Sequence, residues 1–191
     1  MKSFADQIKE YARLAVAAGV NLQPGQTLVL ECPVSAYEFG RQIAEYAYQA
    51  GAREVAPLWL DERMTRLKYE YAPLEAFEKA PAWYAHFMND YAAENAAFLY
   101  VESGDPDLMR GVDAQKQLFN FKSRKEATKP YRKLFDENEL QWHILAVPNP
   151  AWAKKVFPAD DTESGMAKLW QAIFACVRVD QGDALENWRI H

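Results

Sequence analysis

The stretch "TLVLECPVSAYEFGRQIAEYAYQAGAREVAPLWL", residues 27–60, decides the fold class of this 191-residue chain. It opens with a short β-rich apolar run over 27–32, bounded by glycine and proline, which is the pattern of a buried strand. A helical pattern follows over 35–51, and a second β-rich run occupies 53–60. Strand, helix and strand in succession predict a right-handed unit whose two strands pair in parallel.

The helix over 35–51 carries its own boundary signals. Its apolar residues recur at helical spacing, at Phe39, Ile43, Ala47 and Ala50. Ser35 is followed three residues later by Glu38, which predicts a capping box at the start of the helix, and Gly51 is a natural stop. In the second strand, Pro57 cannot donate a ladder hydrogen bond, so we expect this strand near an edge of the sheet.

The same alternation continues to the end of the chain. Further strands are predicted at 96–103 and 142–148, and further helices at 3–19 (capped by Ser3), 61–94 (broken at Pro73 and Pro81), 113–135 (interrupted at Pro130), after Asn149-Pro150, and 162–179. Alternating strands and helices form mainly parallel sheets. We therefore predict one three-layer α/β domain, with a mainly parallel sheet of four or five strands and helices on both faces.

Charge and composition exclude several classes of function. The net charge is −5, whereas nucleic-acid binding requires a basic face. The most basic run, 122–133, is interrupted by Glu126 and is interpreted as a solvated helix face. No apolar run is long enough to span a membrane, and the first residues lack the apolar stretch of a signal peptide. Cys32 and Cys176 form no C-x-x-C pair, so we expect a cytoplasmic protein in a reducing compartment, without nucleic-acid or membrane partners.

Ligands of open α/β sheets bind at the carboxyl ends of the strands, so those ends were searched for chemistry. G-x-G-x-x-G, P-loop, H-E-x-x-H and G-x-S-x-G patterns are all absent. The start of helix 35–51 could hold an anion, but the expected capping box already uses its amides. Cys32 would need a neighbouring base to act as a nucleophile. His86, His143 and His191 cannot be placed beside it from sequence, so a buried inert thiol is favoured.

Two sets of acidic residues were weighed as metal ligands. The first follows the third strand and consists of Glu102, Asp105, Asp107 and Asp113. Clustered carboxylates can hold a divalent cation, but these residues also suit turn and cap positions. The second set shares one helical face and consists of His86, Asp90 and Glu94. A solvated polar face explains it better than metal ligation. From its residues alone, the chain is predicted to contain no catalytic, metal-binding or cofactor-binding site.

A set of ordered blocks resembles one known family. The blocks are "YARLAVAAGVNLQPGQTLVLECPVSAYEFGRQIAEYAYQAGAREV" (11–55), "LWLDE" (58–62), "ESGDPDLMRGVD" (102–113), "WHILAVPNPAWAKKVFP" (142–158) and "LWQAIFACVRVDQGDALENWRIH" (169–191). Together they are similar to the amino-terminal half of the thermophilic-type metalloaminopeptidases, the aminopeptidase T, S and II family. The most specific elements are L-W-x-A-I-F, R-V-D and the final W-x-x-H.

The resemblance implies a division of labour. In that family an α/β domain precedes a catalytic domain, where two glutamates, two histidines and an aspartate hold two divalent ions, zinc, cobalt or magnesium. None of those positions lies within 1–191. The resemblance thus implies that 1–180 is a non-catalytic amino-terminal domain and that 181–191 begins the connection to a missing catalytic domain. The chain alone would be inactive, and within a homodimeric enzyme acting on peptides it would wall the substrate cavity and support assembly.

Two other classes of function stay open from the residues. One is a free-standing α/β protein that binds a small ligand, and the other is a dimerisation or interaction domain.

The last residues, "DALENWRIH" (183–191), look like the first turns of a helix whose Trp188 and Ile190 lack an apolar partner. We expect the catalytic domain to cover them. Without it, they are expected to fray or to pack against a second copy of the chain.

Overall fold

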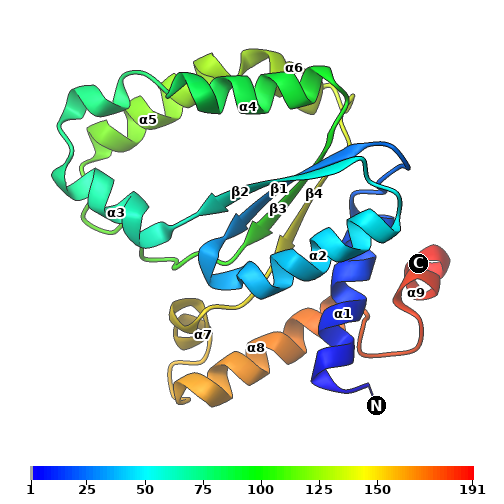
Figure 1. Ribbon diagram of the computed structural model, residues 1–191. Helices are drawn as coiled ribbons and strands as arrows, with labels where there is room; N and C mark the ends of the chain where they lie inside the picture. The colour runs from blue at the N-terminus through cyan, green and yellow to red at the C-terminus, as the bar shows by residue number, and fades with distance from the viewer. Residues whose placement is uncertain (1) are drawn as a thin grey trace.

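A four-stranded parallel sheet lies at the centre of the protein (Figure 1). The computed structural model describes residues 2–191. The strands are β1 (Thr27–Pro33), β2 (Glu54–Leu60), β3 (Ala97–Glu102) and β4 (Trp142–Ala146), in the order β2-β1-β3-β4. All three neighbouring pairs are parallel, and Pro57 lies in the edge strand β2. The predicted fold class is confirmed, with four strands.

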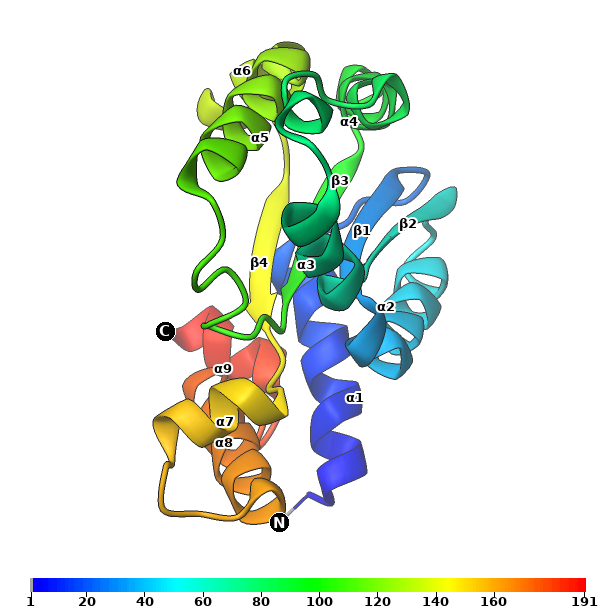
Figure 2. The ribbon, with the colours of Figure 1, turned by 90° about the vertical axis from the view of Figure 1, so that its left-hand side faces the viewer.

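Helices cover both faces of the sheet (Figures 1 and 2). The larger core lies on the face covered by α1 (Phe4–Leu14), the π-turn η1 (Ala15–Gly19), α2 (Tyr37–Gln49), α7 (Pro150–Val156) and α8 (Thr162–Cys176). A smaller core lies on the other face, under α4 (Ala82–Ala93) and α6 (Lys129–Asp136). The two cores differ in extent, so the two faces of the sheet are not equally filled.

Beside α4 and α6, three further elements form a lobe over the edge of the smaller core. They are α3 (Glu62–Tyr71), the 3-10 turn η3 (Leu74–Phe77) and α5 (Ala114–Ala127). Tyr69 stacks on Phe77 with ring centroids 4.8 Å apart, and Ser123 Oγ donates to the Phe77 carbonyl. Helix α5 has no buried residue, so it lies over the sheet without filling the space beneath it.

Strand β1 alternates strictly between the two cores. Leu28, Leu30 and Cys32 belong to the larger core, whereas Val29 belongs to the smaller one. Because side chains of a strand alternate, Glu31 shares the face of Val29. A carboxylate is thereby placed on the sheet surface beneath α4 and α5.

The start of α2 corrects one prediction. Residues 34–36 form a 3-10 turn, the N-cap of α2 is Ala36, and no side chain caps the helix. The capping box at Ser35 and Glu38 is therefore wrong. The chain passes from Pro33 directly into the turn, so Ser35 already lies in a helical turn and cannot face the first free amides. A capping box does form at α1, between the predicted cap Ser3 and Asp6.

The remaining helix breaks follow the prolines. The helical stretch 61–94 divides at Pro73 and Pro81, as predicted. The helix predicted over 113–135 divides at Thr128, and Pro130 lies in the first turn of α6, where a missing amide hydrogen costs nothing.

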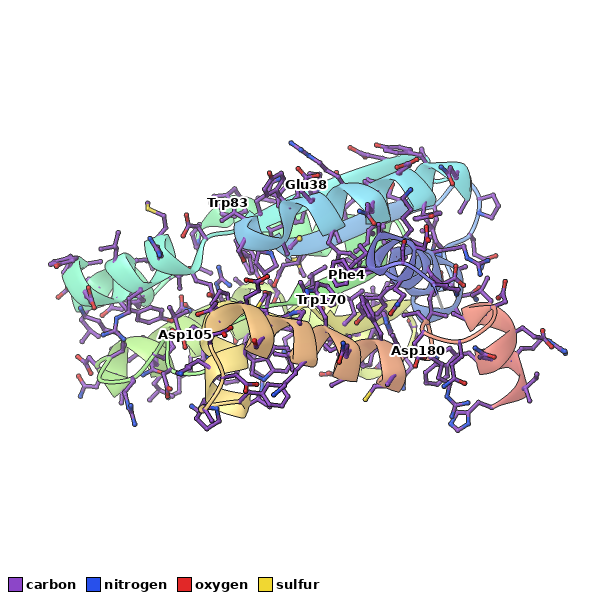
Figure 3. The ribbon with its side chains drawn as sticks, turned by 90° about the horizontal axis from the view of Figure 1, so that it is seen from below. Phe4, Glu38, Trp83, Asp105, Trp170 and Asp180 are labelled. Atoms are coloured by element: carbon purple, nitrogen blue, oxygen red, sulfur yellow. The ribbon has the colours of Figure 1, made fainter. Side chains whose placement is uncertain are left out.

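The apolar stripe of α8 packs into the larger core. Ile173 and Phe174 are buried, and Trp170 stacks on Phe174 with centroids 5.1 Å apart. Figure 3 shows Trp170 beside Phe4, whose ring meets it edge-on at 5.7 Å. The first and last long helices of the chain are thus held together by aromatic contact.

The C-terminal segment is a packed helix, α9 (Ala184–Ile190). Ala184 is fully buried, and its amide donates to Glu10 Oε1 at 3.0 Å. Asp183 pairs with Arg13 at 3.0 Å, and the indole of Trp188 donates to the Val177 carbonyl. The expected fraying of 183–191 is therefore wrong, because α1 supplies the partners that the local sequence lacks. Ile190 nevertheless stays 73% exposed.

Replacing Gly19 with alanine should destabilise the protein. A Cβ at this position would lie 2.7–2.9 Å from three ring atoms of His143, a half-buried imidazole on β4. We expect Gly19→Ala to lose about 1–3 kcal/mol of unfolding free energy in urea melts, as overpacking does. Ala18→Ser, at an exposed neighbour, should stay within about 0.5 kcal/mol. A His143→Ala background should relieve the loss, and an undiminished loss there would contradict the clash.

The attachment of α9 should depend on the charge of Glu10. Burial alone would raise the pKa of Glu10, but hydrogen bonds from Arg13 and Ala184 outweigh it and lower that pKa. A lowered pKa in the folded state stabilises at neutral pH, and this stabilisation is lost as pH falls through that pKa. Glu10→Gln should cost roughly 0.5–1 kcal/mol at about pH 7 and progressively less in acid. Glu137→Gln, at an exposed position, is the control, and a pH-independent loss in Glu10→Gln would refute the charge effect.

Candidate functional site

The carboxyl edge of the sheet is occupied by contacts within the chain. The Glu62 carboxylate accepts from the amide of Asp105, and Arg66 donates to the carbonyls of Leu108 and Arg110. The buried Asn149 amide group donates to the Ser103 carbonyl. Figure 3 places Asp105 at this edge of the molecule. The usual ligand position of an open α/β sheet is therefore filled with internally satisfied polar groups.

The acidic residues after β3 do not converge. Asp105 accepts from the amide of Asp107, and Asp107 pairs with Lys155 at 2.9 Å, which lowers the pKa of Asp107. Asp113 caps α5 through the amide of Gln115. Asp105 and Asp113 thus have the turn and cap roles that their sequence context suggested.

The histidine-containing set is equally dispersed. His86 lies 3.6 Å from Asp90 on the exposed face of α4, whereas Glu94 pairs with Arg53. His143 is on β4, where burial lowers its pKa, and His191 contacts Arg178. The three histidines are therefore on separate parts of the fold.

These placements do not fit the two-ion centre that the resemblance implies for the family. Among residues 2–191, no three His, Cys, Asp or Glu side chains come together in a way that could hold a metal ion. Over the same residues, no helix is long and apolar enough to cross a bilayer.

Cys32 has the character of a core residue. It is fully buried, its Sγ lies near the carbonyls of Pro33 and Ala36, and burial raises the pKa of the thiol to about 12. A thiol in this environment is neither ionised nor accessible. The structure therefore supports the interpretation of Cys32 as a buried inert thiol.

The most distinctive cavity lies on the other face of the sheet. It is an open hollow of about 400 Å³, lined by residues of β1, β3 and the helices α3 to α6. Its walls include Tyr69, Tyr84, Tyr100, Tyr131, Glu31 and Arg124. We call it the tyrosine pocket. A larger hollow of about 680 Å³ between α5 and α6 is lined mainly by long charged side chains that pair with one another, such as Lys129 with Glu126.

Polar groups in the tyrosine pocket are strongly perturbed. Burial raises the pKa of Glu31, opposed by the positive charge of Arg124 and reinforced by Glu102. The hydroxyls of Tyr100 and Tyr131 lie 2.5 Å apart, and burial followed by this contact raises the pKa of Tyr100. The Arg124 guanidinium lies 4.2 Å from the ring centroid of Tyr84. Perturbed groups converging in one cavity are typical of functional sites.

No sequence pattern predicts this pocket. One signal was present, because Glu31 is the only charged residue in the apolar strand run 27–32. The basic run 122–133 was interpreted as a solvated face, but Arg124, Lys125 and Arg132 line the pocket. That interpretation was incomplete, since no sequence pattern shows which turn of α5 overhangs the sheet.

The fold defines the chain as a parallel three-layer α/β domain. A profile of the thermophilic metalloprotease (M29) family matches residues 4–191, and the chain belongs to this family.

Named relatives agree with this assignment. The chain is 40% identical over 191 residues to Aminopeptidase 2 of Geobacillus stearothermophilus and 36% identical to Aminopeptidase AmpS of Bacillus subtilis (strain 168), and it is fully covered in both. It spans about half the length of these relatives, 46% and 47%. The solved structure of wild-type AmpT from Thermus thermophilus matches with a TM-score of 0.83 and 34% identity, over 90% of this chain and 43% of that one.

The two cysteines should differ sharply toward a thiol reagent. Cys176 is exposed, whereas Cys32 is buried with a raised pKa. In the folded protein at about pH 8, a disulfide reagent should modify Cys176 alone, and Cys32 should react only after denaturation. Cys176→Ser should abolish the reaction of the folded protein. Fast modification of that variant without denaturant would show that Cys32 is accessible.

Proposed function

We propose that this chain is the amino-terminal, non-catalytic part of a metal-dependent aminopeptidase that removes amino-terminal residues from peptides. The observation that carries the proposal is the family match over residues 4–191 combined with relatives about twice as long. The dispersed carboxylates and histidines support the same division, because each already has a local partner or role. Two divalent ions, zinc, cobalt or magnesium, would belong to the remainder of the enzyme and would supply the activated water for hydrolysis.

In the complete enzyme, we propose that this chain walls the substrate cavity and supports assembly into a homodimer. Exposed apolar side chains support such contacts. Met64, Leu67 and Tyr71 repeat at positions i, i+3 and i+7 on α3 and are exposed, and Trp83 is 59% exposed on α4. Apolar stripes of this kind mark surfaces that are covered in an assembly.

We further propose that 1–180 form the domain and that 181–191 begin the connection to the catalytic domain. Helix α9 is held to α1 on one side, while Trp188 and Ile190 stay partly exposed on the other. One helix anchored to this domain and apolar toward a second one is suited to such a junction. The two free thiols support a cytoplasmic location for the enzyme.

The 191-residue chain should not hydrolyse aminoacyl anilides. With Leu- or Phe-anilide and added zinc, cobalt or magnesium, we expect no turnover above the metal-only blank, because no described residues assemble a metal site. A full-length relative such as Aminopeptidase 2 serves as the positive control.

Two outcomes would decide the matter. Turnover near that of the control would contradict the assignment of catalysis to a missing part. Recovery of activity on adding the separately expressed remainder of the enzyme would support it.

A further inference from the structure

The tyrosine pocket is lined by two side chains of opposite charge that are not paired with each other. Glu31 and Arg124 both line it, and each influences the other electrostatically, yet they form no ion pair. We propose that this pocket binds a small zwitterion of the amino-acid class, with its ammonium group at Glu31 and its carboxylate at Arg124. The proposal concerns binding by this chain itself and does not depend on the proposed peptidase function.

Glu31 provides the anionic end of the site. It lies on the sheet floor of the pocket, with Tyr84, Tyr100 and Tyr131 also in the lining. Among residues 2–191, no protein donor is hydrogen-bonded to its carboxylate, although burial penalises the charge. The side chain of Glu31 is half-buried, and an ammonium group in the pocket would provide both the opposite charge and hydrogen bonds.

Arg124 provides the cationic end. Its guanidinium is held over the Tyr84 ring and has no carboxylate partner within the described chain. Neighbouring cations of the same basic run differ, since Lys129 pairs with Glu126 and Arg132 with Asp136. A free guanidinium fork is the preferred protein group for a carboxylate.

The balance of charge favours a zwitterion over a simple ion. Lys125 and Arg132 also line the pocket, so three cations oppose a purely cationic ligand. A purely anionic ligand would leave Glu31 without a donor and would meet its negative charge. A ligand with both groups satisfies both charged side chains of the lining.

Size and walls agree with this class of ligand. The cavity volume of about 400 Å³ falls in the range of about 300–1,000 Å³ that is usual for small-molecule sites. Aromatic rings from five elements line it, at Tyr69, Tyr84, Tyr100, Phe121 and Tyr131. Such rings pack against an apolar side chain, and their faces attract an ammonium group. L-Phenylalanine is therefore a suitable probe.

The ligand's charges are tested first. Calorimetric titration of the 191-residue chain with L-phenylalanine should show saturable binding. N-acetyl-L-phenylalanine lacks the ammonium, and L-phenylalanine amide lacks the carboxylate. Each should bind at least about tenfold more weakly, because one charged group of the pocket then lacks its partner. No saturable binding of L-phenylalanine, or equal binding of either analogue, would overturn the proposal.

Variants then test the orientation. Glu31→Gln and Arg124→Gln should each weaken L-phenylalanine binding about tenfold. Glu31→Gln should not weaken binding of the N-acetyl analogue, and Arg124→Gln should not weaken binding of the amide, because the group that each side chain would pair with is already absent and a like charge is removed. Controls are Glu45→Gln, on α2 across the sheet, and Arg63→Gln, exposed on α3. Thermal melts verify that each variant is folded. Equal losses in the variants and the controls would overturn the assignment of Glu31 and Arg124.

Discussion

The architecture depends on the position of β1, which is hydrogen-bonded to β2 on one side and to β3 on the other. Its side chains are buried on both faces of the sheet, so each face must be covered by helices. The larger core on one face gathers α1, α2, α7 and α8, and the smaller core gathers α4 and α6. The asymmetry leaves a cavity under α5, and it is there that the charged residue of β1, Glu31, is found.

Helix α1 joins the first and last parts of the chain. Residues of α1 contact α8 through Phe4 and α9 through Glu10 and Arg13, so the C-terminal segment is ordered by the N-terminal one. These contacts join segments more than 150 residues apart in the chain, as the 174-residue separation of Glu10 and Ala184 shows. Substitutions in α1 that remove these contacts should therefore loosen the attachment of α9.

In this member of the thermophilic metalloprotease (M29) family, the polar groups at the carboxyl edge of the sheet make contacts within the chain. The carboxyl edge of its sheet is filled by Glu62, Arg66 and Asn149, which bind the chain's own backbone. Glu31 and Arg124, which form no ion pair, lie instead in the tyrosine pocket, between the sheet and the helices α3 to α6. The polar groups that hold the backbone at the carboxyl edge are thus separate from the charged groups that line the tyrosine pocket.

The sequence by itself determined the strand and helix order, the parallel class of the sheet and the edge position of β2. These follow from local rules, since apolar periodicity, prolines and caps act within a few residues. Only the tertiary structure decided three other features: the 3-10 entry to α2, the docking of α9 and the pocket beneath α5. The last two depend on groups distant in sequence, such as Glu10 facing Ala184 or Glu31 and Arg124 lining one pocket, and local patterns carry no record of such pairings.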